Sequence, residues 1–192
     1  MREIQTALTE PQKQLLLHLA RANIGSEWHH ELHNEIASIK EKLITIARPQ
    51  ACFVTLHLDS RLRGCIGTLE AIACLPDAVG HYARAAAFED PRFPPLTLPE
   101  WVAVTISITL LGLLRPISAQ SREIVLSRLA VKKDGLYLKD ADHSATFLPM
   151  VWQQLPQPET FLDALLQKGG WPTGRWPEHL QAWQYSGEEF SE

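Results

Sequence analysis

Apolar residues recur at helical spacing in two stretches near the N-terminus. Thr9 to Gln12 has the pattern of a capping box, so a helix is expected to begin there, continue through the apolar positions of 15–22 and end near Gly25. Residues Leu32 to Ile46 carry a second apolar repeat with helical spacing, which predicts an amphipathic helix. Pro49 is expected to end it, because proline disfavours helical backbone in the residue before it.

The next stretch has no helical period and is rich in residues that favour strands. Residues 51–58 predict one strand, Asp59 and Ser60 predict a turn, and residues 61–68 predict the returning strand of a hairpin. A β-hairpin is therefore expected in the first half of the chain.

A third helix is expected from Leu75, and it must end by Asp90 because Pro91 follows. The segment 91–96 is too rich in proline for a helix or a central strand, so it predicts a stiff, ordered loop. Residues 102–111 carry β-branched side chains throughout and predict a strand.

The second half of the chain mixes short strands with short helices. The expected elements are a helix over 123–129, a hairpin turn at Asp134 and Gly135, strands over 136–139 and 145–148, a helix from Pro158 to Gly169, and a last strand over 180–190. No alternation of strand, helix and parallel strand is visible. The pattern predicts an α+β fold with mainly antiparallel sheets flanked by helices.

Composition narrows the class of protein. A chain of 192 residues can form one large domain or two small ones. The formal net charge of -4 argues against nucleic acid as a partner, and no stretch is apolar enough to predict a membrane span. The N-terminus lacks the apolar core of a secretory signal, and the cysteine count of 3 is odd, so free thiols and a cytoplasmic location are expected.

The segment Leu62 to Gly67 sets a single thiol between two glycines. Alternation along a strand would place Arg61, Arg63 and Cys65 on one face, where positive charge favours the thiolate. The two glycines would let another backbone or a ligand approach closely. Cys65 is therefore a candidate nucleophile, and the alternative is a small buried apolar residue.

A nucleophilic Cys65 needs a base, and His57 is the nearest histidine in the sequence. A two-residue turn would place Cys65 opposite Val54, with His57 on the other face of the hairpin. A three-residue turn would instead place Cys65 opposite Thr55, on the face of His57. The sequence alone leaves both registers open.

Three arginines are candidates for binding an anion: Arg61, Arg63 and Arg92, since a guanidinium offers a fork of donors to carboxylate or phosphate. The alternative is structural pairing with Glu70, Glu89 or Asp90, and for each arginine taken alone we favour it.

Two other groups of residues are candidates for a metal site and for a binding cleft, but the sequence favours a structural explanation for both. His29, His30 and His33 lie close to Glu31 and Glu35, yet no third ligand stands at a telling distance, so a solvated polar face is preferred over a metal site. For Trp171 and Trp176, packing in a core is preferred over lining a cleft. No metal and no cofactor are expected.

Taken together, the motifs resemble the AMMECR domain family, over residues from about Leu15 to the C-terminus. The resemblance rests on Leu62 to Gly67, on the segment 86–96, and on the shorter motifs at 133–136, 147–149, 161–162 and 168–170. It implies an α+β domain over residues 9–190 with a larger subdomain and a smaller one inserted within it. The site that it implies comprises Leu62, Arg63, Gly64, Cys65, Ile66 and Gly67, together with Asp90, Arg92 and Phe93. Two departures are Met150, where the family commonly has glutamine, and Thr105, where an acidic residue is frequent.

The resemblance also implies partners. Prokaryotic members resemble protein A of the AmmeMemoRadiSam system, which is associated with a Memo-like protein and a radical S-adenosylmethionine protein. The first functional hypothesis is therefore a binding or partner subunit of a modification system whose motif binds a small anionic ligand or a partner segment. The alternative is an enzyme that uses Cys65 as a nucleophile or thiol carrier in a cleft with Arg63 and Arg92.

Overall fold

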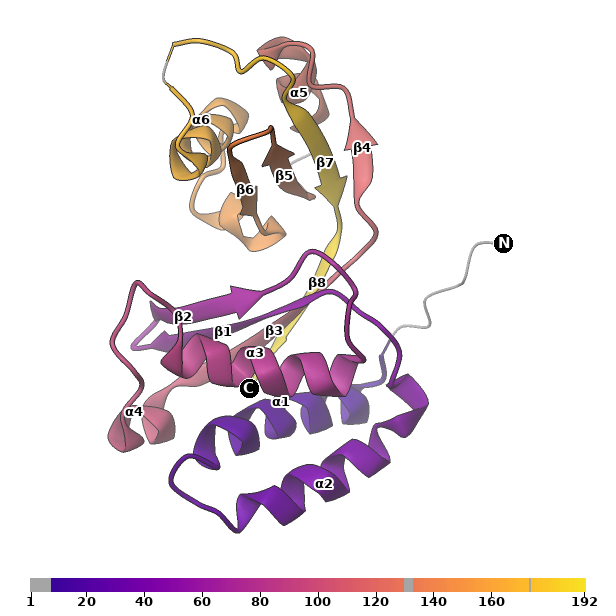
Figure 1. Ribbon diagram of the computed structural model, residues 1–192, viewed down its shortest axis with the longest axis vertical. Helices are drawn as coiled ribbons and strands as arrows, with labels where there is room; N and C mark the ends of the chain where they lie inside the picture. Colours follow the sequence, from indigo (N-terminus) through magenta and orange to yellow (C-terminus); the bar gives the residue numbers. More distant parts are fainter. Residues whose placement is uncertain (1–7, 130–132, 173) are drawn as a thin grey trace. The chain divides into compact units, whose positions relative to one another are not determined.

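The structure is a computed structural model that describes residues 8–129, 133–172 and 174–192 (Figure 1). Its helices and two four-stranded sheets make an α+β fold, which confirms the predicted class. The chain divides into two compact units, one ending at Leu110 and resuming at Glu188, the other running from Leu111 to Gly187. None of the described helices is long and apolar enough to cross a membrane.

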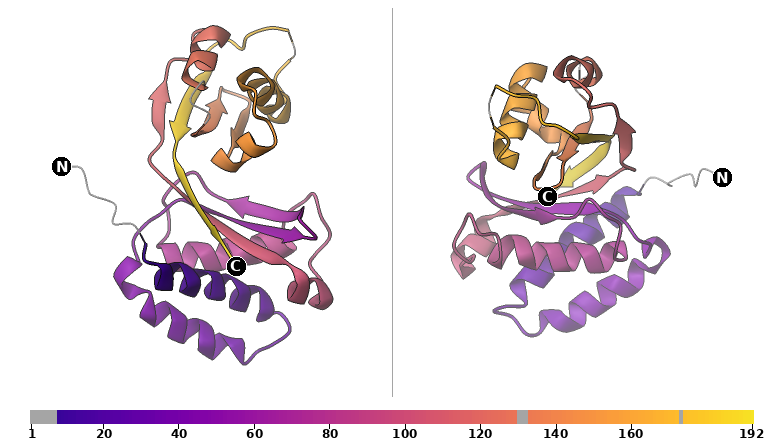
Figure 2. Two further views of the ribbon diagram at one scale, coloured as in Figure 1. Left: turned by 180° about the vertical axis from the view of Figure 1, so that it is seen from behind. Right: turned by 45° about the horizontal axis from the view of Figure 1, so that its top comes forward.

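The first unit combines a helical layer with an antiparallel sheet. Its helices are α1 (Glu10–Gly25), α2 (Leu32–Lys42), the 3-10 helix η1 (Ile44–Ile46), α3 (Leu75–Phe88) and α4 (Leu98–Ala103). Its strands are β1 (Cys52–Leu58), β2 (Arg61–Gly67), β3 (Thr105–Leu111) and β8 (Gly187–Ser191), in the order β2-β1-β3-β8. Helices α1, α2 and α3 lie on one side of the sheet (Figures 1 and 2).

The core of this unit lies between helices α1 and α3 and the sheet. Its fully buried side chains include Leu16, Leu19, Val54, Leu56, Ile106 and Ile108. The predicted capping box of α1 is present, since the Thr9 amide donates to Gln12 Oε1 at 2.9 Å. Helix α3 ends at Phe88, before Pro91, as expected.

The second unit has its own sheet, ordered β4-β7-β5-β6, and its own core. The strands are β4 (Arg115–Ile117), β5 (Gly135–Lys139), β6 (Ser144–Phe147) and β7 (Gln181–Tyr185), and the helices are α5 (Arg122–Leu129), the 3-10 helix η2 (Pro149–Gln153) and α6 (Pro158–Gly169). Phe161 of α6 is fully buried and stacks on Trp152 at 3.8 Å between ring centroids. Trp171 is buried in the same core, as preferred from the sequence.

Two expected elements, a strand and a turn, differ in position from the structure. The strand predicted over 102–111 begins only at Thr105, because Thr97 and Glu100 form a capping box that starts α4. The hairpin turn predicted at Asp134 and Gly135 is wrong, since Gly135 is the first residue of β5. The turn between β5 and β6 lies at Asp140, whose Oδ1 accepts two main-chain amides further along the turn.

The other differences are a helix that ends earlier than predicted, a predicted strand that is divided in two, and a strand that was not predicted. The second predicted helix ends at Lys42 and continues only as the 3-10 turn η1. The single last strand predicted over 180–190 is two strands, β7 and β8, which belong to different sheets. Strand β4 was not expected from the sequence.

Candidate functional site

The hairpin of β1 and β2 contains a bulge that sets the position of Cys65. Leu58 pairs with Arg61, so the turn has two residues, and His57 pairs with Leu62. Leu56 then pairs with Gly64, which leaves Arg63 as an extra residue on β2. The turn is therefore the shorter of the two considered, yet the bulge produces the register expected from the longer one.

This register places Cys65 directly opposite Thr55. The buried Thr55 hydroxyl donates to the Cys65 sulfur at 3.2 Å, and the thiol is half-buried. Strand β1 pairs with β3 without interruption through Thr55 and His57, so these two side chains lie on the same face. Cys65 therefore shares its face with His57, whose ring is half-buried.

The two glycines of the motif allow close approach of main chain, as predicted. A Cβ added to Gly64 would lie 2.0 Å from the carbonyl oxygen of Ala86 in α3. A Cβ on Gly67 would lie 2.3 Å from the carbonyl oxygen of Cys52 in β1. What approaches each glycine is the protein's own backbone, so the glycines explain how β2 fits between α3 and β1.

Asp90 follows α3 and is buried, with only 2% of its side chain exposed. Its Oδ2 accepts the main-chain amide of Cys65 at 2.9 Å, and its Oδ1 accepts the amide of Arg92 at 3.1 Å. The Arg92 guanidinium donates to both carboxylate oxygens, at 2.9 and 2.6 Å. These bonds, first among them those from Arg92, hold the pKa of Asp90 at about 2.

Arg92 completes the contact with β2. Its Nη2 donates to the carbonyl oxygen of Cys65 at 3.3 Å, while 50% of its side chain stays exposed. The pKa of Arg92 is raised, chiefly by its hydrogen bonds with Asp90 and also by the charge of Cys65. Two side chains thus satisfy the amide and the carbonyl of Cys65 at the outer edge of the sheet.

Arg63 is directed to a different carboxylate. Its Nε and Nη2 donate to the two oxygens of Glu100 at 2.8 and 3.1 Å, and the side chain is 9% exposed. Hydrogen bonds from Arg63 and from Thr97 lower the pKa of Glu100 to about 2. The structural pairing favoured from the sequence holds for Arg63, but Glu100 was missed as the partner. The signal that could have found it is the Thr97–Glu100 capping box before a short helix.

Phe93 lies close to two of the three arginines that the sequence singled out. The guanidinium carbons of Arg63 and Arg92 lie 5.8 and 5.5 Å from its ring centroid, in the range of cation–π contacts. The structure therefore brings Arg63, Cys65, Asp90, Arg92 and Phe93 together. Arg61 is instead exposed beside the turn, because the bulge interrupts the alternation that would keep it level with Arg63.

Other candidates have ordinary surroundings. Cys52 is buried, which raises the pKa of its thiol to about 12. His30 and His33 stack on one another, and His29 contacts Glu31. Among the described residues, no group of three or more His, Cys, Asp or Glu is arranged to hold a metal ion.

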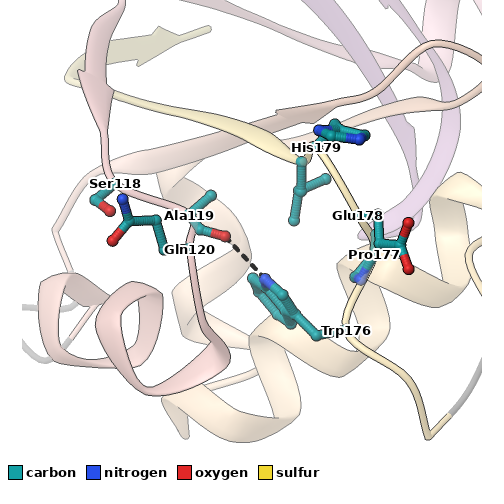
Figure 3. A pocket seen from close by; sticks show the side chains of 8 residues that line it. Ser118, Ala119, Gln120, Trp176, Pro177, Glu178 and His179 are labelled. Carbon is teal, nitrogen blue, oxygen red and sulfur yellow. Dashed lines mark hydrogen bonds between the residues drawn. The ribbon is translucent and has the colours of Figure 1, made fainter.

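The surface of the described residues has hollows in both units. One of about 430 Å³ lies at the β1–β2 turn and is lined by Leu58, Asp59, Arg61, Leu62 and Arg63. The other, of about 550 Å³, belongs to the second unit and is lined in part by Trp176 and His179 (Figure 3). The Trp176 indole donates to the carbonyl oxygen of Ala119 at 2.8 Å, so it packs partly against the core and partly lines this hollow.

Comparison with known proteins relates the chain to a family. The family model AMMECR1 matches residues 17–190. Protein MJ0810 of Methanocaldococcus jannaschii is 32% identical over 151 residues, which cover 74% of this chain and 73% of that protein. A protein of Thermofilum pendens is 34% identical over 164 residues, covering 81% of this chain and 75% of the relative.

A solved structure agrees with these matches. The crystal structure of the uncharacterized protein PH0010 from Pyrococcus horikoshii superposes with a TM-score of 0.79 at 26% identity, covering 96% of this chain and 93% of that one. The fold, the extent of the family match and the identity with these relatives lead to one conclusion. The chain belongs to the AMMECR1 family.

Proposed function

We propose that this protein is a binding subunit of a modification system, acting with a Memo-like protein and a radical S-adenosylmethionine protein. The surface that contacts the partner is formed by Cys65, Arg92 and Phe93, with Asp90 behind it. Its free thiols suit a cytoplasmic location.

One observation carries this proposal. Arg92 is half exposed, yet its guanidinium is fixed by a buried carboxylate and by the main chain of Cys65. A charged group that is exposed but held in one orientation loses little conformational entropy when a partner binds. Beside it, the half-buried Phe93 ring adds apolar area, and arginine with an aromatic residue is a common centre of binding energy in interfaces.

The test is co-purification with a Memo-like protein that is expressed together with this one. The Arg92→Ala and Phe93→Ala variants are expected to weaken the complex at least about tenfold, which corresponds to about 1.4 kcal/mol. Arg128→Ala is the matched control, because Arg128 is an exposed arginine in α5 of the other unit. Unchanged binding by both site variants, or no complex with the intact protein, contradicts the proposal.

A second candidate function is an enzyme that uses Cys65 as a nucleophile or thiol carrier, with His57 as the base. It is favoured by the register that places Cys65 opposite Thr55 and on the face of His57. In such a step the thiol proton passes to the imidazole and the sulfur adds to an electrophilic carbonyl carbon, while the π electron pair of that carbonyl moves to its oxygen. A Cys65→Ser variant that keeps full function in cells would exclude this candidate.

A further inference from the structure

The hollow at the β1–β2 turn has more positive than negative charge in its lining. Its charged lining residues are Arg61, Arg63 and Asp59, of which Arg63 is paired with Glu100, and its apolar lining residues are Leu58 and Leu62. Leu62 is 40% exposed although it is a large apolar residue. Within the described part of the chain, Arg61 forms no ion pair.

Arg63 has hydrogen-bonding capacity that the described protein leaves unused. The Nη1 atom of this side chain is buried and has no hydrogen-bond partner among the described residues. The side chain as a whole is 9% exposed. Burying donors of a charged group without an acceptor is costly.

The nearest carboxylates are already engaged. Glu100 uses one oxygen for Arg63 Nε, and its other oxygen accepts from Arg63 Nη2, from the Thr97 amide at 2.9 Å and from the Thr97 hydroxyl at 2.8 Å. Asp90 is held by Arg92 and by the amide of Cys65. Arg63 Nη2 also donates to the carbonyl oxygen of Pro95 at 3.4 Å, so Nη1 is the nitrogen of this guanidinium that has no partner among the described residues.

The turn beside the hollow is held in an uncommon backbone conformation. Asp59 and Ser60 have φ values of 50° and 62°, the left-handed region that favours glycine, although neither is glycine. A two-residue hairpin turn requires this conformation, so the pairing of β1 with β2 keeps the turn in one shape. The turn thus presents Arg61 from a fixed backbone.

We propose that this hollow binds a carboxylate, with Arg61 and Arg63 as donors and Leu62 as the apolar wall beside it. The inference rests on the proposed function, since the ligand would be an acidic side chain or a chain terminus of the partner. Planar guanidinium groups match a carboxylate, as the contact of Arg63 with Glu100 already shows. Asp59 on the rim disfavours the doubly charged form of phosphate.

The experiment uses NMR of the ¹⁵N-labelled full chain at constant ionic strength. N-acetyl-leucine supplies a terminal carboxylate, N-acetyl-glutamate amide supplies a side-chain carboxylate, and inorganic phosphate is the competing anion. Both carboxylates, or one of them, are expected to shift the amides of residues 59–63 and the Arg63 guanidinium signals, with saturation in the millimolar range. The one that saturates at lower concentration identifies the source.

The variants separate this binding from general charge effects. Arg61→Gln, which leaves the Arg63–Glu100 pair intact, is expected to weaken carboxylate binding about tenfold. Arg128→Gln is the control and should bind as the parent protein does. Shifts that do not saturate, equal shifts in Arg61→Gln, or saturation by phosphate alone overturn the inference. Because no partner protein is present, failure here is distinct from failure of the co-purification test.

Discussion

The carboxylate of Asp90 accepts the main-chain amide of Cys65 at 2.9 Å, although the two residues are 25 positions apart in the chain. Arg92 donates to the carbonyl oxygen of the same cysteine at 3.3 Å. The segment 86–96 therefore completes the outer edge of β2 as a further strand would, because Asp90 accepts from an amide of this edge and Arg92 donates to a carbonyl oxygen. These two contacts explain in structural terms why the two longest motifs lie side by side.

Asp90→Asn should destabilise the first unit by about 2–3 kcal/mol, the range for losing hydrogen bonds to a charged buried group. The change keeps the size of the side chain but removes the charge that holds Arg92. Urea denaturation followed by far-ultraviolet circular dichroism measures it. Asp163→Asn is the control, since that carboxylate is 61% exposed and pairs with Arg122 at the surface. Equal effects of the two substitutions would contradict the assigned role of Asp90.

Stability should fall as the pH is lowered, and Asp90 and Glu100 should account for part of that fall. Both carboxyl groups have pKa values of about 2, below their ordinary values of 3.8 and 4.5. Between about pH 5 and pH 2 the unfolded chain therefore binds more protons than the folded one, so the stabilisation present at higher pH is lost. The double variant Asp90→Asn, Glu100→Gln should be less stable at neutral pH and show a shallower loss over this range.

Gly64→Ala should destabilise the protein by at least about 3 kcal/mol, as expected for overpacking against backbone that cannot move aside. The added methyl group would lie 2.0 Å from the Ala86 carbonyl oxygen. The control is Gly80→Ala in α3, where the nearest atoms are the amide end of the Asn23 side chain, at 3.0 Å. The Asn23 amide donates to the Leu19 carbonyl oxygen at 2.7 Å and must move only by a few tenths of an ångström, and alanine favours helix over glycine, so Gly80→Ala should destabilise the protein far less than Gly64→Ala.

Ser60→Gly should stabilise the hairpin by about 0.5–1 kcal/mol, because glycine adopts positive φ without the steric cost that a side chain brings. Ser60 has a φ of 62° and its side chain is exposed, so little contact is lost. Ser60→Val, with a β-branched side chain, should destabilise it. Thermal melts of the two variants give opposite signs if the turn has this conformation in solution.

Thr55→Val should slow alkylation of Cys65 several-fold near neutral pH, because it removes the hydroxyl that donates to the sulfur at 3.2 Å. A hydrogen bond to sulfur favours the reactive thiolate. Thr55→Ser keeps the donor and should restore the rate. Mass spectrometry after iodoacetamide treatment measures each thiol, and the buried Cys52 reports whether a variant has unfolded. Equal rates in the valine and serine variants would show that the hydroxyl has no effect.

The spacing of apolar residues predicted most helices and strands of the first unit, because residues within or next to each element determine its type and its ends. Helices α1 and α3 carry their own start and stop residues, and β1 and β2 read as strands from their composition. The bulge at Arg63 could not be predicted, because it follows from two contacts between residues that are distant in the sequence. Arg63 pairs with Glu100, and Gly64 packs against the main chain of α3. The register of Cys65 was therefore open until the fold was known.

Two other features were not predicted for the same reason, namely that they depend on contacts between distant parts of the sequence. The short α4 was hidden in a stretch of β-branched residues, and only its capping box at Thr97 separates it from β3. The sequence of β7 and β8 shows one continuous pattern of apolar and polar residues. No residue near Ser186 indicates that the chain passes there from one sheet to the other. Pairing partners decide such cases, and a single sequence does not contain them.

The position of β8 has a consequence for synthesis on the ribosome. When β3 leaves the ribosome, one of its two edges has no partner strand. Strand β8 can pair with this edge only after residues 111–187 have been synthesised. Over that interval a nascent chain carries an unpaired strand edge, the feature most prone to pair with other chains. Completion of the first sheet is thereby tied to the arrival of the last strand, so a stalled or truncated product is left with an open sheet.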